Sequence, residues 1–141
     1  LFERKNKRKE ALVMAKKSIL IKKEFYNLHT LIMILLWNDE IEEAVDILKT
    51  ELIKEEYVIK RIKEMSEILN FFIAKKQYNF IYKLFKENMF EMKERYKPIY
   101  FALLSFMGNK YETERKKMGP ELIETVNEVI AVIKRMEKDY K

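Results

Sequence analysis

The sequence of 141 residues contains no cysteine, only two glycines and only two prolines. The lack of cysteine excludes disulfides and thiolate metal sites, which suits a reducing compartment. The scarcity of glycine and proline argues against a sheet protein, because the many tight turns of such a protein need these residues. Long helices joined by few turns are therefore the expected architecture.

The chain also lacks a long apolar run. The longest ones, residues 31–37 and 99–107, are well short of the roughly 20 residues that span a bilayer. The first residues have no apolar core of the kind that signal peptides carry. We therefore expect a cytoplasmic protein with no membrane partner. Because the sequence starts with Leu1 and not with Met, we expect it to be a fragment of a longer chain.

Helical periodicity runs through almost the whole sequence, since apolar residues recur three and four positions apart. The pattern predicts helices over residues 3–23, 25–36, 40–52, 56–74, 78–96, 98–108 and from 120 onward. The inward face of the fourth range includes Ile59. Asp39 with Glu42, and Asn109 with Glu112, have capping-box spacing, and the second pair could start a short helix ending near residue 117. About seven helices are thus predicted in an all-α fold, one of them short.

An internal repeat decides how these helices are arranged. Four apolar residues in the second predicted helix are Leu28, Leu31, Ile32 and Leu35, and the pattern returns 37 residues later as Met65, Ile68, Leu69 and Phe72. After the turn, the first set is followed by Ile41, Ala44 and Leu48, and the second by Tyr78, Ile81 and Phe85. The first helix of a third repeat carries Pro98, Phe101, Ala102 and Ser105.

These spacings resemble degenerate tetratricopeptide repeats. The small residue of that family is replaced by Ile32 in one unit and by Leu69 in the next, and only Ala102 keeps it. The resemblance implies a short α-solenoid of antiparallel helix hairpins that occupies residues 1–141 as one domain. An irregular helical bundle is the alternative, because helical periodicity suits both.

The C-terminal part has a second resemblance. The segments Tyr96-Lys97-Pro98-Ile99-Tyr100-Phe101-Ala102-Leu103-Leu104, Met118-Gly119-Pro120-Glu121-Leu122 and Glu124-Thr125-Val126 resemble the end of repeat arrays in large prokaryotic P-loop ATPases. In such proteins, as the resemblance implies, the repeats follow the nucleotide domain and sense or recruit a partner. The present chain contains no Gly-rich phosphate-binding loop, so any ATPase domain would lie outside it.

Catalytic and metal-binding chemistry has no positive signal. His29 is the only histidine, and a lone histidine on an apolar helix is usually a packed or groove-lining residue. None of the three serines stands in a Gly-flanked nucleophile elbow. The acidic residues between 39 and 46 lack the paired Glu-x-x-His motifs of helical di-iron sites, so a solvated helix face explains them better. We expect no enzymatic activity, no cofactor and no metal.

Charge is distributed unevenly. Residues 1–23 carry nine Lys or Arg and two Glu, a net charge of +7, whereas residues 24–56 carry two Lys and nine acids, a net charge of −7. The candidates for phosphate binding are Arg4, Lys5, Lys7, Arg8 and Lys9. This segment lacks the interleaved aromatic residues that stack on bases, so an exposed helix face is favoured over a nucleic-acid site. The opposite charges could also pair between helices or between copies, giving a homo-oligomer.

A set of large or polar residues on two predicted helices has the spacing of a shared groove. Its members in the first repeat are Tyr26, His29, Met33 and Trp37, and those in the next are Lys63, Ser66 and Asn70. Met and aromatic side chains suit a groove that holds a helix or an extended peptide. Alternatively, Trp37 fills the turn between two helices.

The first hypothesis is therefore a non-catalytic protein–protein interaction module that binds a peptide or helix of a partner. A basic helical nucleic-acid-binding domain is the alternative, and a structural oligomerisation segment of a multidomain ATPase is the second alternative.

Overall fold

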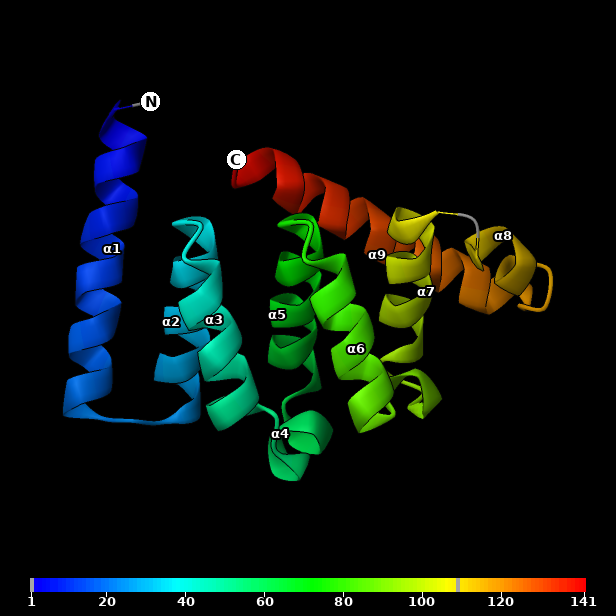
Figure 1. The fold of residues 1–141 in the computed structure, drawn as a ribbon, viewed down its shortest axis with the longest axis horizontal. Coiled ribbons are helices and arrows are strands. Elements are labelled where there is room, and N and C mark those ends of the chain that lie inside the picture. The colour runs from blue at the N-terminus through cyan, green and yellow to red at the C-terminus, as the bar shows by residue number, and fades with distance from the viewer. Residues whose placement is uncertain (1, 109) are drawn as a thin grey trace. The chain divides into compact units, whose positions relative to one another are not determined.

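The computed structural model describes residues 2–108 and 110–141, and all regular structure in this part of the chain is helical (Figure 1). The α-helices in these residues are α1 (Phe2–Ile21), α2 (Phe25–Trp37), α3 (Ile41–Ile47), α4 (Glu55–Lys60), α5 (Ile62–Ala74), α6 (Tyr78–Asn88), α7 (Lys97–Met107), α8 (Lys110–Arg115) and α9 (Pro120–Asp139). A π-helical turn, η1 (Leu48–Leu52), continues α3, and a 3-10 turn, η2 (Phe90–Met92), follows α6. The prediction of an all-α fold is confirmed.

The described residues form nine α-helices and not about seven, because Arg61 interrupts the predicted helix over residues 56–74 and the short helix suggested before residue 117 is present as α8. The predicted helix over residues 78–96 also ends early. Arg61, with φ −119° and ψ 45°, separates α4 from α5, whereas helical residues have ψ near −42°. Met89 adopts a left-handed conformation with φ 56° and ends α6. The capping box predicted to start at Asn109 lies outside the described residues.

The turn between α2 and α3 differs from the predicted capping box at Asp39. Glu40 occupies the N-cap of α3 and makes no side-chain capping hydrogen bond, while Asp39 has a positive φ of 59°. The N–H of Glu40 donates to the carbonyl of Leu35 at 2.9 Å, and the N–H of Asp39 donates to that of Leu36 at 3.1 Å. This pair of bonds is the Schellman motif that ends helices. Asp39 thus closes α2, and the N-cap position of α3 belongs to Glu40.

The same turn occurs 37 residues later, between α5 and α6. Lys76 has a φ of 63°, the N–H of Gln77 donates to the carbonyl of Phe72 at 3.0 Å, and the N–H of Lys76 donates to that of Ile73 at 2.8 Å. The helix bounds follow the same offset: α5 begins and ends 37 residues after α2, and α6 begins 37 residues after α3. The α2–α3 and α5–α6 segments therefore have the same local structure in the same register.

Burial follows this register as well. Ile41 and Tyr78 are half-buried. The other residues predicted to repeat are buried in both segments: Leu28, Leu31, Ile32, Leu35, Ala44 and Leu48 in the first, and Met65, Ile68, Leu69, Phe72, Ile81 and Phe85 in the second. By contrast, Ile59, which was predicted to face inward, is 56% exposed. Because Arg61 interrupts the helix, the buried face of α4 does not continue that of α5. Val58 is therefore buried in place of Ile59.

The chain divides into two compact units, residues 1–68 and 69–141, with the boundary inside α5. In the first unit α2 packs against α1, α3 and η1. The apolar face of α2 supplies more buried residues than any other element of this unit, and Ala15 of α1 is buried as well.

In the second unit α7 packs against α6, α8, η2 and α9. Its core is rich in aromatic side chains: Phe85 meets Phe90 edge-on at 5.4 Å between ring centroids, and Phe90 stacks on Tyr96 at 5.2 Å. Burial raises the pKa of Tyr96 to about 12. Val126 and Ile133 are the buried residues of α9.

The burial of two leucines in the first unit gives a test of this packing. Leu35 is fully buried and Leu20 is 87% exposed. We expect Leu35→Ala to lower the free energy of unfolding by about 2–5 kcal/mol, because it opens a cavity, and Leu20→Ala to change it by less than about 0.5 kcal/mol. Urea denaturation followed by the fluorescence of Trp37, the only tryptophan, reports on this unit. Equal losses for the two variants would contradict the packing of α1 and α2.

Candidate functional site

One face of α2 stays outside the core, and it carries the four residues that were predicted to line a groove. Tyr26 is 50% exposed, and His29, Met33 and Trp37 are half-buried. On the other side of the helix, Ile32 is fully buried. We call these four residues the α2 face. It offers aromatic, imidazole and thioether groups together on one surface of the first unit.

Tyr26 is held in place by Arg61, the residue that interrupts α4 and α5. The Arg61 Nη1 donates a hydrogen bond to the Tyr26 hydroxyl oxygen at 3.0 Å. The guanidinium carbon lies 5.0 Å from the ring centroid of Tyr26 and 5.7 Å from that of buried Phe25, and both are cation–π distances. Tyr57 of α4 packs on Phe25 at 4.7 Å. The cation therefore binds two rings of α2 and fixes the orientation of the exposed one.

His29 lies beside a carboxylate of α5. Its Nε2 is 3.8 Å from Glu67 Oε2, and its ring stacks on Phe25 at 6.2 Å. Burial lowers the pKa of His29 below its ordinary value of 6.5, while the negative charges of Glu67 and Glu64 act in the opposite direction. Because the desolvation is the larger effect, the imidazole is mainly neutral at neutral pH.

Trp37 lies where α1 crosses the C-terminal end of α2. Arg8 Nη1 donates to the carbonyl oxygen of Trp37 at 3.0 Å, and Asn38 Nδ2 donates to the carbonyls of Arg8 and Ile34, both at 2.9 Å. A cation at this position satisfies a carbonyl at the helix end and opposes its negative dipole. Arg8 is thus engaged with α2, which corrects the expectation that it is presented for phosphate together with its basic neighbours. Those neighbours are exposed, namely Arg4, Lys5, Lys7 and Lys9.

The corresponding face of α5 differs from that of α2. Lys63 is exposed and Ser66 is half-buried, both in the first unit. Asn70, in the second unit, is only 8% exposed, and its Oδ1 accepts no hydrogen bond from the described residues. The expectation that Asn70 lines an accessible groove is therefore corrected, because its neighbours in the sequence, Leu69 and Phe71, are core residues and the amide is buried with them.

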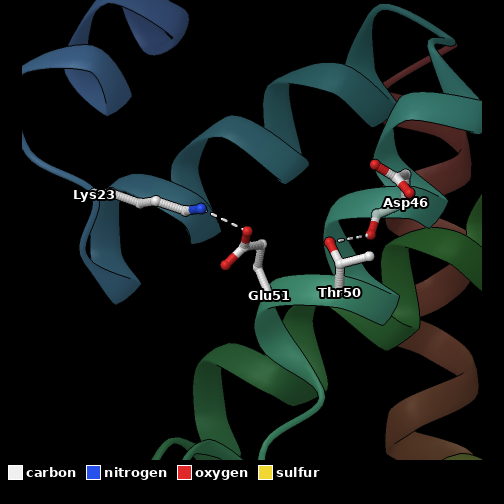
Figure 2. Close-up of polar contacts among 4 residues, drawn as sticks. All are labelled: Lys23, Asp46, Thr50 and Glu51. Carbon is white, nitrogen blue, oxygen red and sulfur yellow. Dashed lines mark hydrogen bonds and ion pairs between the residues drawn. The ribbon is translucent and has the colours of Figure 1, made fainter.

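Lysines of the basic segment 1–23 form ion pairs with glutamates of the acidic segment 24–56 within the first unit. Lys16 of α1 pairs with Glu43 of α3 at 3.4 Å, and Lys23 pairs with Glu51 of η1 at 2.6 Å (Figure 2). The hydrogen bond from Lys23 lowers the pKa of the Glu51 carboxyl. Thr50, next to Glu51, donates from Oγ1 to the carbonyl of Asp46 at 2.8 Å. Of the two arrangements considered from the sequence, pairing between neighbouring helices is present.

Metal ligation and a small-molecule pocket are the remaining kinds of site. Among residues 2–108 and 110–141, no three His, Asp or Glu side chains gather as metal ligands would. A hollow of about 300 Å³ in the second unit is lined by Phe106, Lys134, Glu137, Lys138 and Lys141. Its volume is at the lower end for ligand sites. Lys138 lies in the last turn of α9, where a cation stabilises the helix dipole, and this accounts for it without a ligand.

The contacts that Arg61, Tyr57 and Glu67 make with residues of α2 were not predicted from the sequence. Helical periodicity placed Arg61 inside one continuous helix, and no proline or glycine occurs in this segment to signal an interruption. The proximity of Glu67 to His29 follows from the packing of α5 near α2 and could be inferred only if the repeat arrangement were already known.

No protein-family model matches the chain, and no curated protein and no solved structure matches it. In the part of the chain that the structure describes, no helix has both the length and the apolar character needed to cross a membrane. The function must therefore be inferred from the residues of the site and their geometry.

The pKa of His29 predicts a pH dependence of stability. The unfolded state binds a proton near pH 6.5, and the folded state binds it only at lower pH. The stability due to neutral His29 is therefore complete above pH 6.5 and is lost as the pH falls from 6.5 through the folded pKa. We expect the free energy of unfolding of the unmodified chain to fall relative to that of His29→Gln over this range, measured by urea denaturation at several pH values.

The variant Glu67→Gln tests whether the negative charge of Glu67 opposes the effect of burial on the pKa of His29. It removes a group that raises the pKa of His29, so the imidazole should titrate at a still lower pH in an NMR titration. A pKa of His29 above 6.5 in the unmodified chain would show that the carboxylates outweigh burial, and would contradict this description of the site.

Proposed function

We propose that the chain is a non-catalytic helical-repeat module that binds a helix or an extended segment of a partner protein. In this proposal, consecutive antiparallel helix hairpins form a short α-solenoid similar to tetratricopeptide repeats. The first helix of each hairpin presents the binding surface, and the α2 face is the best-developed part of it.

The shared register of two segments is the observation that carries the proposal. The α2–α3 and α5–α6 segments have helix bounds offset by 37 residues, and both have a positive φ at the equivalent turn residue, Asp39 or Lys76. Their buried positions also correspond. Repeated helical hairpins commonly build extended surfaces for protein partners, and this supports a binding role over a catalytic one.

The residue types of the α2 face also favour a protein partner. Tyr, Trp and Arg are the residues that contribute most to protein interfaces, and here Tyr26, Arg61 and Trp37 are all only partly buried. The hydrogen bond from Arg61 to Tyr26 restricts the tyrosine before any partner arrives, which lowers the entropy lost on binding. Met33, between them, supplies a flexible apolar contact.

His29 is explained within this surface without a catalytic role. Its ring stacks on Phe25 and its Nε2 faces Glu67, so it is held as one member of an aromatic row. The lowered pKa keeps it neutral, which reduces the cost of covering it with a partner.

The α2 face can be tested without knowledge of the natural partner. Peptides would be selected from a phage-displayed random library against the purified chain, and their affinities measured by fluorescence polarisation. We expect Trp37→Ala and Met33→Ala to weaken the selected peptides about tenfold, and each to cost less than about 2 kcal/mol of stability, because half-buried side chains leave small cavities. Ile59→Ala, a change at an exposed apolar residue of another helix, α4, is the matched control.

Two outcomes would contradict the proposal. Peptides that bind the variants and the unmodified chain equally would show that binding does not use the α2 face. A loss of about 3–5 kcal/mol of stability in Trp37→Ala, the cost of emptying a core site, would show that Trp37 fills the turn between the helices, as the alternative from the sequence holds.

Nucleic-acid binding is the second candidate, because Arg4, Lys5, Lys7 and Lys9 are exposed together on α1. If these residues bind phosphates, affinity for duplex DNA or RNA should fall steeply with salt, because bound counterions are released. If the protein-binding proposal is right, we expect only weak binding in gel-shift titrations at about 50 and 200 mM salt.

The test variant replaces Arg4, Lys5, Lys7 and Lys9 with Gln. The matched control replaces four other exposed cations, Lys134, Arg135, Lys138 and Lys141, with Gln. Arg8 is left unchanged in the test variant because it stabilises the end of α2. Tight, salt-sensitive binding that is lost only in the variant of residues 4, 5, 7 and 9 would make nucleic-acid binding the better proposal.

A further inference from the structure

Helix α1 leaves four large apolar side chains in solvent. Leu20 and Ile21 are each 87% exposed, Met14 is 63% exposed and Val13 is 53% exposed. Its buried contact with α2 is instead made by a small residue, Ala15. Single exposed apolar residues are ordinary on protein surfaces, but a contiguous group on one helix is typical of an interaction site.

The four residues form one stripe on the side of α1 that is turned away from α2. Val13 and Leu20 are seven residues apart, as are Met14 and Ile21, so each pair lies two helical turns apart on the same side. Within the unit, α2 and α3 lie on the other side of α1 (Figure 1). We call Val13, Met14, Leu20 and Ile21 the α1 stripe.

A lysine stands in the middle of this stripe. Lys17 follows Val13 by four residues and precedes Ile21 by four, so it is the neighbour of both pairs on the helix surface. It is exposed and makes no ion pair with the described residues, whereas Lys16, on the flank, is paired with Glu43 at 3.4 Å. The stripe therefore combines apolar contacts with one positive charge at its centre.

The surroundings of the stripe are also basic. Exposed Lys9 lies one turn before Val13, and exposed Lys7 lies two turns before Met14, whereas Glu10 lies one turn before Met14. Glu10 is the single acidic residue between positions 4 and 23. A helix that covers the apolar side chains must therefore meet an excess of positive charge.

Pairing of the stripe with itself is disfavoured by its own symmetry. Lys17 lies midway between Val13 and Ile21 in the sequence, so a second copy that is centred on the stripe, and therefore buries all four apolar residues, would bring Lys17 against Lys17 whether the two helices run parallel or antiparallel. Like charges placed opposite each other in an interface are strongly unfavourable. A partner with a carboxylate at the equivalent position would turn the same contact into an attraction.

We infer that the α1 stripe docks an acidic amphipathic helix of a partner protein, with Leu20 and Ile21 as the apolar anchors and Lys17 paired to a carboxylate in the centre of the partner's apolar face. This is the helix-on-helix mode of recognition, in which apolar residues supply contact area and charges select the partner. The inference deepens the proposed function, on which it rests, by adding a second surface and the chemistry of the helix that it takes.

The test uses three fluorescein-labelled helical peptides and the full chain. The first peptide has a leucine stripe interrupted by one central Glu, with Glu on both flanks. The second has Lys in place of the central Glu, and the third is a scrambled version of the first. By fluorescence polarisation we expect the first to bind at least tenfold more tightly than the other two.

Variants of the chain then locate the binding. Leu20→Ser and Ile21→Ser should each weaken the first peptide about tenfold, while Ile59→Ser, a matched apolar residue of α4 that is 56% exposed, should leave it unchanged. Lys17→Glu should reverse the preference, so that the Lys-centred peptide binds more tightly. Circular dichroism checks that the variants are folded, which their exposure leads us to expect.

The outcomes separate this inference from the proposed function. Equal binding of the first and the scrambled peptide, or no reversal in Lys17→Glu, overturns the α1 inference and leaves the phage-selected peptides of the α2 face unaffected. If Trp37→Ala abolishes binding of the first peptide and Leu20→Ser does not, the peptide binds the α2 face, and the α1 inference is overturned. A dimer seen in sedimentation equilibrium and lost in Leu20→Ser would show instead that a second copy covers the stripe.

Discussion

The left-handed turn that ends α2, and its equivalent after α5, is the constraint on which the rest of the fold depends. Asp39 and Lys76 adopt a positive φ without being glycine, which costs on the order of 1 kcal/mol at each position. The turn reverses the chain within a few residues, so that the buried residues Leu35 and Leu48, one on each side of it, can share a core. The burial of such side chains contributes about 1.5–3 kcal/mol each and offsets the strain.

This geometry also decides which surface remains for function. Once α2 has buried its apolar side against α1, α3 and η1, the row from Tyr26 to Trp37 is what remains of the helix surface at the edge of the core. The interruption at Arg61 places a guanidinium over that row, and Arg8 closes its far end through the carbonyl of Trp37. The candidate site is thus made from groups that also stabilise the unit, which explains why its side chains are only half-buried.

Helix α1 has two different roles on its two sides. Toward the unit, Lys16 neutralises a carboxylate of α3, and Ala15 allows close approach to α2. Just after the helix, Lys23 neutralises a carboxylate of η1. On the opposite side, Lys17 and the exposed Leu20 and Ile21 have no such role within the described residues. One basic segment of the sequence is therefore divided by helical geometry into an inner, structural set and an outer set that is open to a partner.

Sequence alone determined the features that depend on local periodicity. These are the helical fold, most helix bounds, the 37-residue offset and the row from Tyr26 to Trp37, because side chains three and four apart share a face whatever the helix packs against. Only the tertiary structure decided that Arg61 interrupts a helix, that Arg8 is engaged with α2, and that Asn70 is buried. The first two depend on contacts between residues 35 and 29 positions apart. Such contacts leave no trace in the local pattern, since their energy comes from neighbours that are close only once the chain has folded.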